Sequence, residues 1–227
     1  MTLKINFMFK YIDIPKDYIP VNQTVKIITP EFEDITIITP EFGDIIITTI
    51  PPTRTPGDPD IQSQWMTRRE TKLKVLDIPG FPQPVPKPPK VSHVIKETKK
   101  MGKGVFATRD IKFGELVFAE RPLLVIPANF NISGVNPPAH YTMEQQQRII
   151  MMEHEKKLEI MFGRMSEKNQ KDFKELMNSH TEDGSGPLIG VIRTNGFGVM
   201  AKIDEQDFAI TRGYTAIGKI GSRINHR

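Results

Sequence analysis

The spacing of hydrophobic positions along the chain changes near residue 140. Before it, apolar residues come in short runs rich in isoleucine, valine and phenylalanine, as at 35–38, 45–50, 105–108 and 115–126. This content is typical of β-strands. After it, the apolar residues of 145–165 recur at mostly helical spacing. The pattern predicts a mixed α+β fold of short strands interrupted by a helical segment.

Three helices are predicted within the insertion at about 142–195. Thr142 followed by Gln145 is a capping-box pattern that marks the start of the first helix. A second helix is expected to begin at Ser166. Pro187 suits the first position of a third helix. We expect these helices to lie between the two halves of a β-rich core.

The first ninety residues differ from the rest of the chain in composition. They contain a ten-residue repeat, Ile28–Ile37 followed by Ile38–Ile47, and then a proline-rich tract at 79–89. Two copies are too few for a solenoid, prolines break any long strand ladder, and the tract favours an extended linker. We therefore expect residues 1–90 to be a largely irregular arm, disordered or weakly structured, with Trp65 exposed or loosely packed.

Residues 91–227 are expected to form the folded domain. We predict strands within 91–127, then the helical insertion, and finally a strand and a short helix within 208–227.

The composition excludes several kinds of protein. The chain of 227 residues has no cysteine, which rules out disulfides and thiolate zinc sites. Its 31 Lys and Arg face 27 Asp and Glu, and a net charge of +4 is too small to indicate nucleic-acid binding. The longest apolar runs, such as Ile45–Ile47, are far shorter than a membrane span, and the N-terminus lacks a secretory signal. We expect an intracellular protein, nuclear or cytoplasmic.

A histidine and two acidic residues in the first predicted helix raise the question of a metal site. His154 and Glu155 lie about one turn before Glu159, but a zincin helix needs two histidines four residues apart. We therefore predict a solvated charged face and no metal site.

The most informative segment for function is the turn Gly102–Lys103–Gly104. Two glycines around one residue let the backbone approach a small ligand, because no Cβ covers the peptide groups. A strand-like Val105–Thr108 follows, whereas the dinucleotide-binding fingerprint needs a third glycine and a helix. Two interpretations stay open: a tight β-turn chosen for its backbone angles, or a turn that binds an anionic ligand beside the basic cluster Lys99–Lys103.

Three blocks of the sequence are informative together: the glycine turn with the following run through Gly114–Glu115 and Glu120–Pro122, the strings Ser179–Pro187 and Arg193–Gly198, and the end Ser222–His226. They resemble the SET domain of protein-lysine methyltransferases, most closely the fungal branch related to the SET-and-MYND proteins. The resemblance covers the chain from about Val91 to His226. It implies a partial, β-rich SET fold with a helical insertion.

The resemblance implies transfer of a methyl group from S-adenosylmethionine to a lysine side chain of a protein substrate. In the family, the glycine turn, an asparagine after the insertion and an Asn-His pair hold this cofactor. The matching residues here are Gly102, Lys103, Gly104, Asn195, Asn225 and His226. The cysteine-rich MYND and C-terminal zinc modules of many relatives have no counterpart.

The resemblance assigns no catalytic residue to this chain. In the family, a tyrosine that shapes the lysine channel follows the Asn-His pair, which puts it beyond Arg227, and Tyr141 and Tyr214 stand at the wrong positions to replace it. We therefore expect an incomplete and inactive form. Two alternatives stay open: a non-catalytic protein-interaction module that uses the helical insertion and the proline-rich arm, or a gene-model fragment, which the repeat and the abrupt end suggest.

Overall fold

A mixed sheet forms the centre of the molecule. The computed structural model describes residues 14–19, 25–27, 34–39, 43–53, 62–99, 102–129, 135–199 and 213–224. Among these, seven strands form the sheet, in the spatial order β1 (Val25–Ile27), β2 (Ile35–Thr39), β3 (Gly43–Ile50), β4 (Ser63–Arg68), β7 (Leu124–Pro127), β9 (Tyr214–Ile217) and β8 (Phe197–Val199). The predicted mixed α+β class is confirmed.

Strand β3 has buried side chains on both faces of the sheet. Ile45 and Ile47 belong to the main hydrophobic core, whereas Thr48 points to the other face because successive residues of a strand alternate. There its hydroxyl donates to Asp34 at 2.5 Å, and Asp34 accepts from Lys72 of helix α1 (Arg69–Leu76) at 2.7 and 2.8 Å. The isoleucine-rich run therefore holds a helix on one side and the main core on the other.

The parallel pair of β4 and β7 joins the first ninety residues to the rest of the chain. Gln64 lies opposite Leu124 and Trp65 opposite Val125. The sheet therefore contains strands from both sides of the domain boundary expected at residue 90. Residues 34–39, 43–50 and 63–76 form strands and a helix, and they are not part of an irregular arm. The prolines did not prevent strand formation, because Pro51 and Pro52 follow the end of β3 and interrupt no described ladder.

The strands predicted within 91–127 form only in part. Strands β5 (His93–Glu97) and β6 (Lys103–Ala107) make an antiparallel hairpin, and β7 follows at Leu124. The strand expected from Glu115 onward is wrong as far as residue 123. The side chain of Glu115 instead binds its own loop, since it accepts from the backbone of Lys112 at 3.1 Å and pairs with Arg109.

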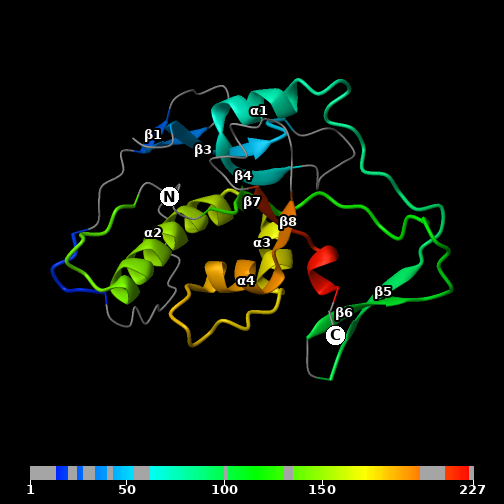
Figure 1. The fold of residues 1–227 in the computed structure, drawn as a ribbon. Coiled ribbons are helices and arrows are strands. Elements are labelled where there is room, and N and C mark those ends of the chain that lie inside the picture. Colours follow the sequence, from blue (N-terminus) through cyan, green and yellow to red (C-terminus); the bar gives the residue numbers. More distant parts are fainter. Residues whose placement is uncertain are drawn as a thin grey trace.

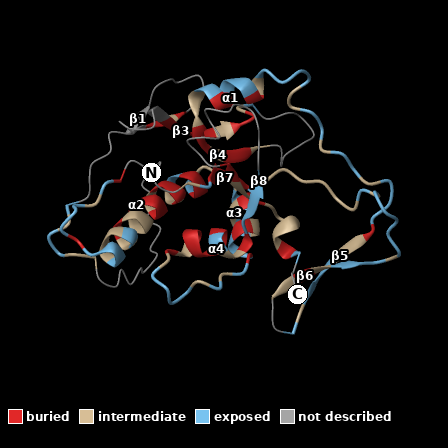
Figure 2. Cartoon of the chain, viewed as in Figure 1, coloured by how far each residue is buried: buried red, intermediate tan, exposed pale blue. Residues whose placement is uncertain are grey.

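The helical insertion agrees with the prediction. Helices α2 (Met143–Gly163), α3 (Glu167–Lys174) and α4 (Pro187–Asn195) lie on the side of the sheet opposite α1 (Figure 1). The buried residues in Figure 2 gather where these helices meet the sheet. Their apolar side chains close the main core against β2, β3, β4, β7 and β9.

The hairpin of β5 and β6 stands away from the sheet (Figures 1 and 2), and half of its strand residues are exposed. A short helical turn, η2 (Gly221–Arg223), follows β9 and lies near β6. The strand and short helix expected within 208–227 are therefore present at 214–217 and 221–223.

Candidate functional site

The predicted glycine turn is only partly a turn: Gly102 precedes β6, whereas Lys103 and Gly104 are the first residues of β6 and pair with β5. Gly102 has a φ of +63°, in the left-handed region that favours glycine, and its carbonyl accepts from the backbone of Thr98 at 2.7 Å. A Cβ on Gly102 would lie 3.2 Å from Met177 Cε, so the turn sits close to the segment after α3. Gly104 is buried. The backbone geometry alone thus accounts for the first glycine.

Lys103 connects this turn to the end of α3 and to η2. Its Nζ lies 2.7 Å from Glu175 Oε2, and Arg223 approaches the same oxygen at 3.6 Å. The hydrogen bond from Lys103 lowers the pKa of Glu175, and the charges of Lys103, Arg223 and Lys171 act in the same direction. Two cations and one carboxylate therefore gather beside the glycine turn.

Asn195 ends α4 and reaches the same neighbourhood through its backbone. Its carbonyl accepts from Ser222 Oγ at 3.1 Å, and Ser222 Oγ also accepts from the backbone of Gly218 at 3.2 Å. Its side-chain Nδ2 donates to the carbonyls of Met177 and Val191 at 2.6 and 2.7 Å. The amide nitrogen of Asn195 is therefore used to hold α4 against the segment after α3.

Glu120 holds the segment between β9 and η2. Its carboxylate accepts from three consecutive backbone N–H groups: Lys219 at 2.8 Å, Ile220 at 2.9 and 3.0 Å, and Gly221 at 2.6 Å. A Cβ on Gly218 would collide with the same carboxylate, so the close approach depends on glycine there. The sequence offered no local signal for this role, because the partners lie about a hundred residues apart.

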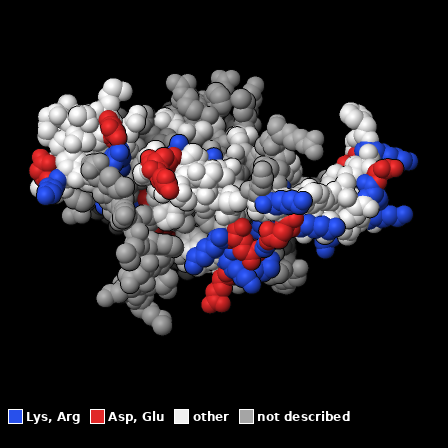
Figure 3. All heavy atoms as spheres, turned by 90° about the horizontal axis from the view of Figure 1, so that it is seen from below, with Lys and Arg blue, Asp and Glu red and all other residues white. Residues whose placement is uncertain are grey.

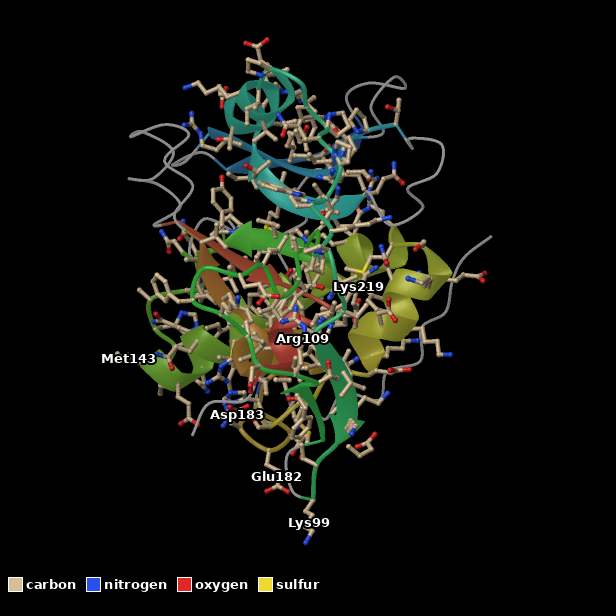
Figure 4. All side chains as sticks on the ribbon, turned by 90° about the vertical axis from the view of Figure 1, so that its right-hand side faces the viewer. Lys99, Arg109, Met143, Glu182, Asp183 and Lys219 are labelled. Atoms are coloured by element: carbon tan, nitrogen blue, oxygen red, sulfur yellow. The ribbon has the colours of Figure 1, made fainter. Side chains whose placement is uncertain are left out.

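The three sequence blocks therefore converge on η2. Lys103, Asn195 and the 219–223 segment are joined through Glu175 and Ser222. Figure 4 shows Lys219 beside α3, where its Nζ lies 3.7 Å from Asp172. The predicted cofactor-binding residues Asn225 and His226 lie outside the described residues, directly after Ile224.

An apolar cavity of about 300 Å³ borders Glu120. Its lining includes the aromatic residues Trp65, Phe197 and Tyr214, together with Glu120, Gly218 and Gly221. The rings of Trp65 and Tyr214 are 6.1 Å apart, and the Tyr214 hydroxyl lies 2.8 Å from Thr67 Oγ1. The sequence did not reveal this cavity, because it places Trp65 in a polar context, while the structure puts it half-buried in β4.

The charged face predicted for α2 is wrong at two residues. His154 and Glu155 are each only 1% exposed. Glu155 accepts from the backbone of Leu188 and Ile189 at 2.7 and 2.9 Å, so its carboxylate caps the start of α4. The prediction failed because helical spacing within α2 does not reveal that α4 packs against it.

Burial shifts the pKa values of three groups on α2. It raises the pKa of Glu155 to about 7, against the lowering effect of its two backbone hydrogen bonds. Burial, with a smaller contribution from the charge of Lys157, lowers the pKa of His154 to about 3. Burial likewise lowers the pKa of Lys157 to about 8. Of these groups, Glu155 lies where α2 packs against the start of α4.

The surface charge of the described residues is mixed. On the face shown in Figure 3, Lys and Arg atoms intermingle with Asp and Glu atoms. No group of three or more His, Cys, Asp or Glu in the described segments is arranged to hold a metal ion. Within the same segments, no helix combines the length and apolar character needed to cross a membrane.

Comparison with protein-family models, with curated proteins and with solved structures finds no match to this chain.

Proposed function

We propose that the chain is a SET-like, S-adenosylmethionine-binding protein of the protein-lysine methyltransferase type, in a form that does not transfer methyl groups. One observation carries the proposal: three blocks that resemble SET sequences separately meet in space around η2. A chance resemblance of three short strings gives no reason for them to converge. The proposed cofactor-binding residues are Gly102, Lys103, Gly104, Asn195, Asn225 and His226.

Gly102 and Lys103 support such a cofactor. At Gly102 no Cβ covers the peptide groups, whereas Gly104 is buried and pairs with β5. Lys103, Arg223 and Glu175 offer both signs of charge at one place, which suits the zwitterionic amino-acid part of S-adenosylmethionine. When bound, the cofactor supplies a methyl group on a sulfonium for transfer to a lysine amine of a protein substrate.

The tyrosines of the described segments support the inactive form. Tyr214 directs its hydroxyl to Thr67, and Tyr141 and Tyr18 pack in a second hydrophobic cluster with Val135 and Ile149. We therefore propose cofactor binding without transfer.

Isothermal titration calorimetry with S-adenosylmethionine tests the proposal. We expect binding near the micromolar level, equivalent to about −8 kcal/mol. The Lys103→Ala variant should bind at least about tenfold more weakly, because Glu175 loses the nearer of its two cationic partners and the turn loses its anchor. Lys96→Ala is the matched control, since Lys96 is an exposed lysine of the same hairpin, and should bind like the wild type.

Two results would contradict the proposal. No heat of binding at millimolar cofactor would remove the cofactor site. Incorporation of labelled methyl groups into histones or a peptide library would show that the protein is active, and would contradict the inactive form only.

A non-catalytic interaction module is the second candidate, and the exposed hairpin region favours it. Phe106 is 44% exposed, Ile95 is 38% exposed, and Phe113 in the following loop is fully exposed. Such side chains in one projecting region suit a protein partner. Calorimetry separates the candidates, because this module needs no S-adenosylmethionine.

A further inference from the structure

Glu120 differs from the other carboxylates near the candidate site in what it binds. Glu175 binds the side chains of Lys103 and Arg223, and Asp172 lies near Lys168 and Lys219. The contacts of Glu120 described above are all with main-chain N–H groups, three of them consecutive. Consecutive N–H groups that point to one anion fix the backbone angles of the peptide units that carry them.

The segment fixed in this way carries both links to the other blocks. Ser222 follows directly and donates to the Asn195 carbonyl. Arg223 comes next, with its Nε on the Lys219 carbonyl at 3.0 Å and its terminal nitrogen near Glu175. If residues 219–221 turned differently, neither side chain would reach its partner. The geometry of the site therefore depends on one carboxylate in the 108–123 loop.

The glycines beside Glu120 support the same conclusion. A Cβ at Gly218 would collide with the carboxylate, and one at Gly221 would lie 3.2 Å from Glu120 Oε1. Neither Gly218 nor Gly221 has a positive φ. At Gly218, therefore, the close approach of Glu120 explains the glycine better than backbone strain does.

We propose that Glu120 is the positioning residue of the candidate site: its carboxylate holds residues 218–221 so that Ser222 and Arg223 align the cofactor-binding blocks. The role rests on the proposed function. Glu120 acts through the backbone, and it need not touch the cofactor itself.

Chemical rescue tests this role. Glu120→Ala removes the carboxylate next to the cavity of about 300 Å³, through which a small anion such as formate can reach the three N–H groups. We expect at least about a tenfold loss of S-adenosylmethionine affinity in calorimetry, equivalent to about 1.4 kcal/mol. Formate at about 100 mM should restore most of it. Glu182→Ala is the matched control, because it removes an exposed carboxylate. It should bind S-adenosylmethionine like the wild type, with or without formate.

Two further measurements separate positioning from loss of the fold. Circular dichroism must show each variant folded at the titration temperature, and Glu120→Ser, which also leaves room for formate, replaces Glu120→Ala if the latter unfolds. The emission of Trp65, the only tryptophan, reports on the same cavity. It should shift to the red in Glu120→Ala and return with formate.

Wild-type affinity in folded Glu120→Ala, or a loss that formate does not reverse, would overturn the positioning role. If the wild type binds no cofactor, the proposed function fails instead. The role of Glu120 in positioning residues 218–221 can then still be tested with formate. Formate should raise the melting temperature of Glu120→Ala and leave that of the wild type unchanged.

Discussion

His154 and Glu155 are neighbours on α2 whose protonation changes in opposite senses on folding. The folded pKa of His154, about 3, is below its unfolded value near 6.5. Its contribution to stability is therefore full above pH 6.5 and is lost as the pH falls toward 3. The folded pKa of Glu155, about 7, is above its unfolded value. Its contribution is full below about pH 4.5 and is lost as the pH rises through 7.

These opposite effects overlap between about pH 4.5 and 6.5, so we expect them to offset in the wild type. Glu155→Gln removes one of them. When the pH is lowered from 7 to 5, the free energy of unfolding of this variant should fall by about 2 kcal/mol relative to that of the wild type. Each group changes stability by up to about 1.4 kcal/mol per pH unit. His154→Leu should show the opposite slope. Urea unfolding at the two pH values measures both.

Glu144→Gln provides the control on the same helix, because Glu144 is exposed and pairs only with Arg148 at 2.6 Å in the described contacts. If the free energy of unfolding changed with pH in the same way in the wild type, Glu155→Gln and His154→Leu, the expected offset of the two groups would be contradicted.

At the scale of elements, local signals in the sequence located α2, α3 and α4 well, whereas α1 lies in the segment that we expected to be irregular. The capping box at Thr142 and Gln145 and the proline at the start of α4 act within one turn, so neighbouring residues alone determine them. Strand pairing depends on distant partners. The run after Glu115 has strand-like composition, but no described strand lies beside it to supply a ladder.

The start of α2 provides a test of this local control. Thr142 Oγ1 accepts from the backbone of Gln145 at 3.2 Å, and Gln145 Oε1 accepts from the backbone of Thr142 at 3.0 Å. Thr142→Ala should lower the free energy of unfolding by about 1 kcal/mol, because the backbone N–H of Gln145 loses its partner. Thr142→Ser keeps the hydroxyl and should stay close to the wild type. Equal stability of the two variants in thermal melts would show that the cap contributes nothing.

At the scale of the molecule, the sheet was the feature that the sequence predicted least well. Ile47 and Met66 come from the presumed arm, and both are completely buried in the same core as Leu124 and Ile217. Composition identified the proline-rich tract correctly as a connection without regular structure. It did not reveal that strands before the tract pair with strands after it, since that pairing is a long-range contact.

This shared core leads to a prediction for the fragment 91–227. Expressed without the first ninety residues, it should fail to form a stable fold, because β7 loses its β4 neighbour and the core loses Ile45, Ile47 and Met66. Circular dichroism and a proton–nitrogen NMR spectrum measure this directly. A dispersed spectrum and a cooperative melt of the fragment would show that the division at residue 90 is a true domain boundary.

The parallel pairing of β4 and β7 also has a consequence for how the sequence can vary. Everything between them, including the proline-rich tract and the β5–β6 hairpin, leaves the sheet and returns to the adjacent position. Doubling the length of such an excursion adds only about 0.6 kcal/mol of closure entropy. Insertions and deletions in the tract should therefore leave the strand register intact. The place of the glycine turn then depends on its anchors Glu175 and Met177, so relatives with tethers of different lengths should keep those contacts.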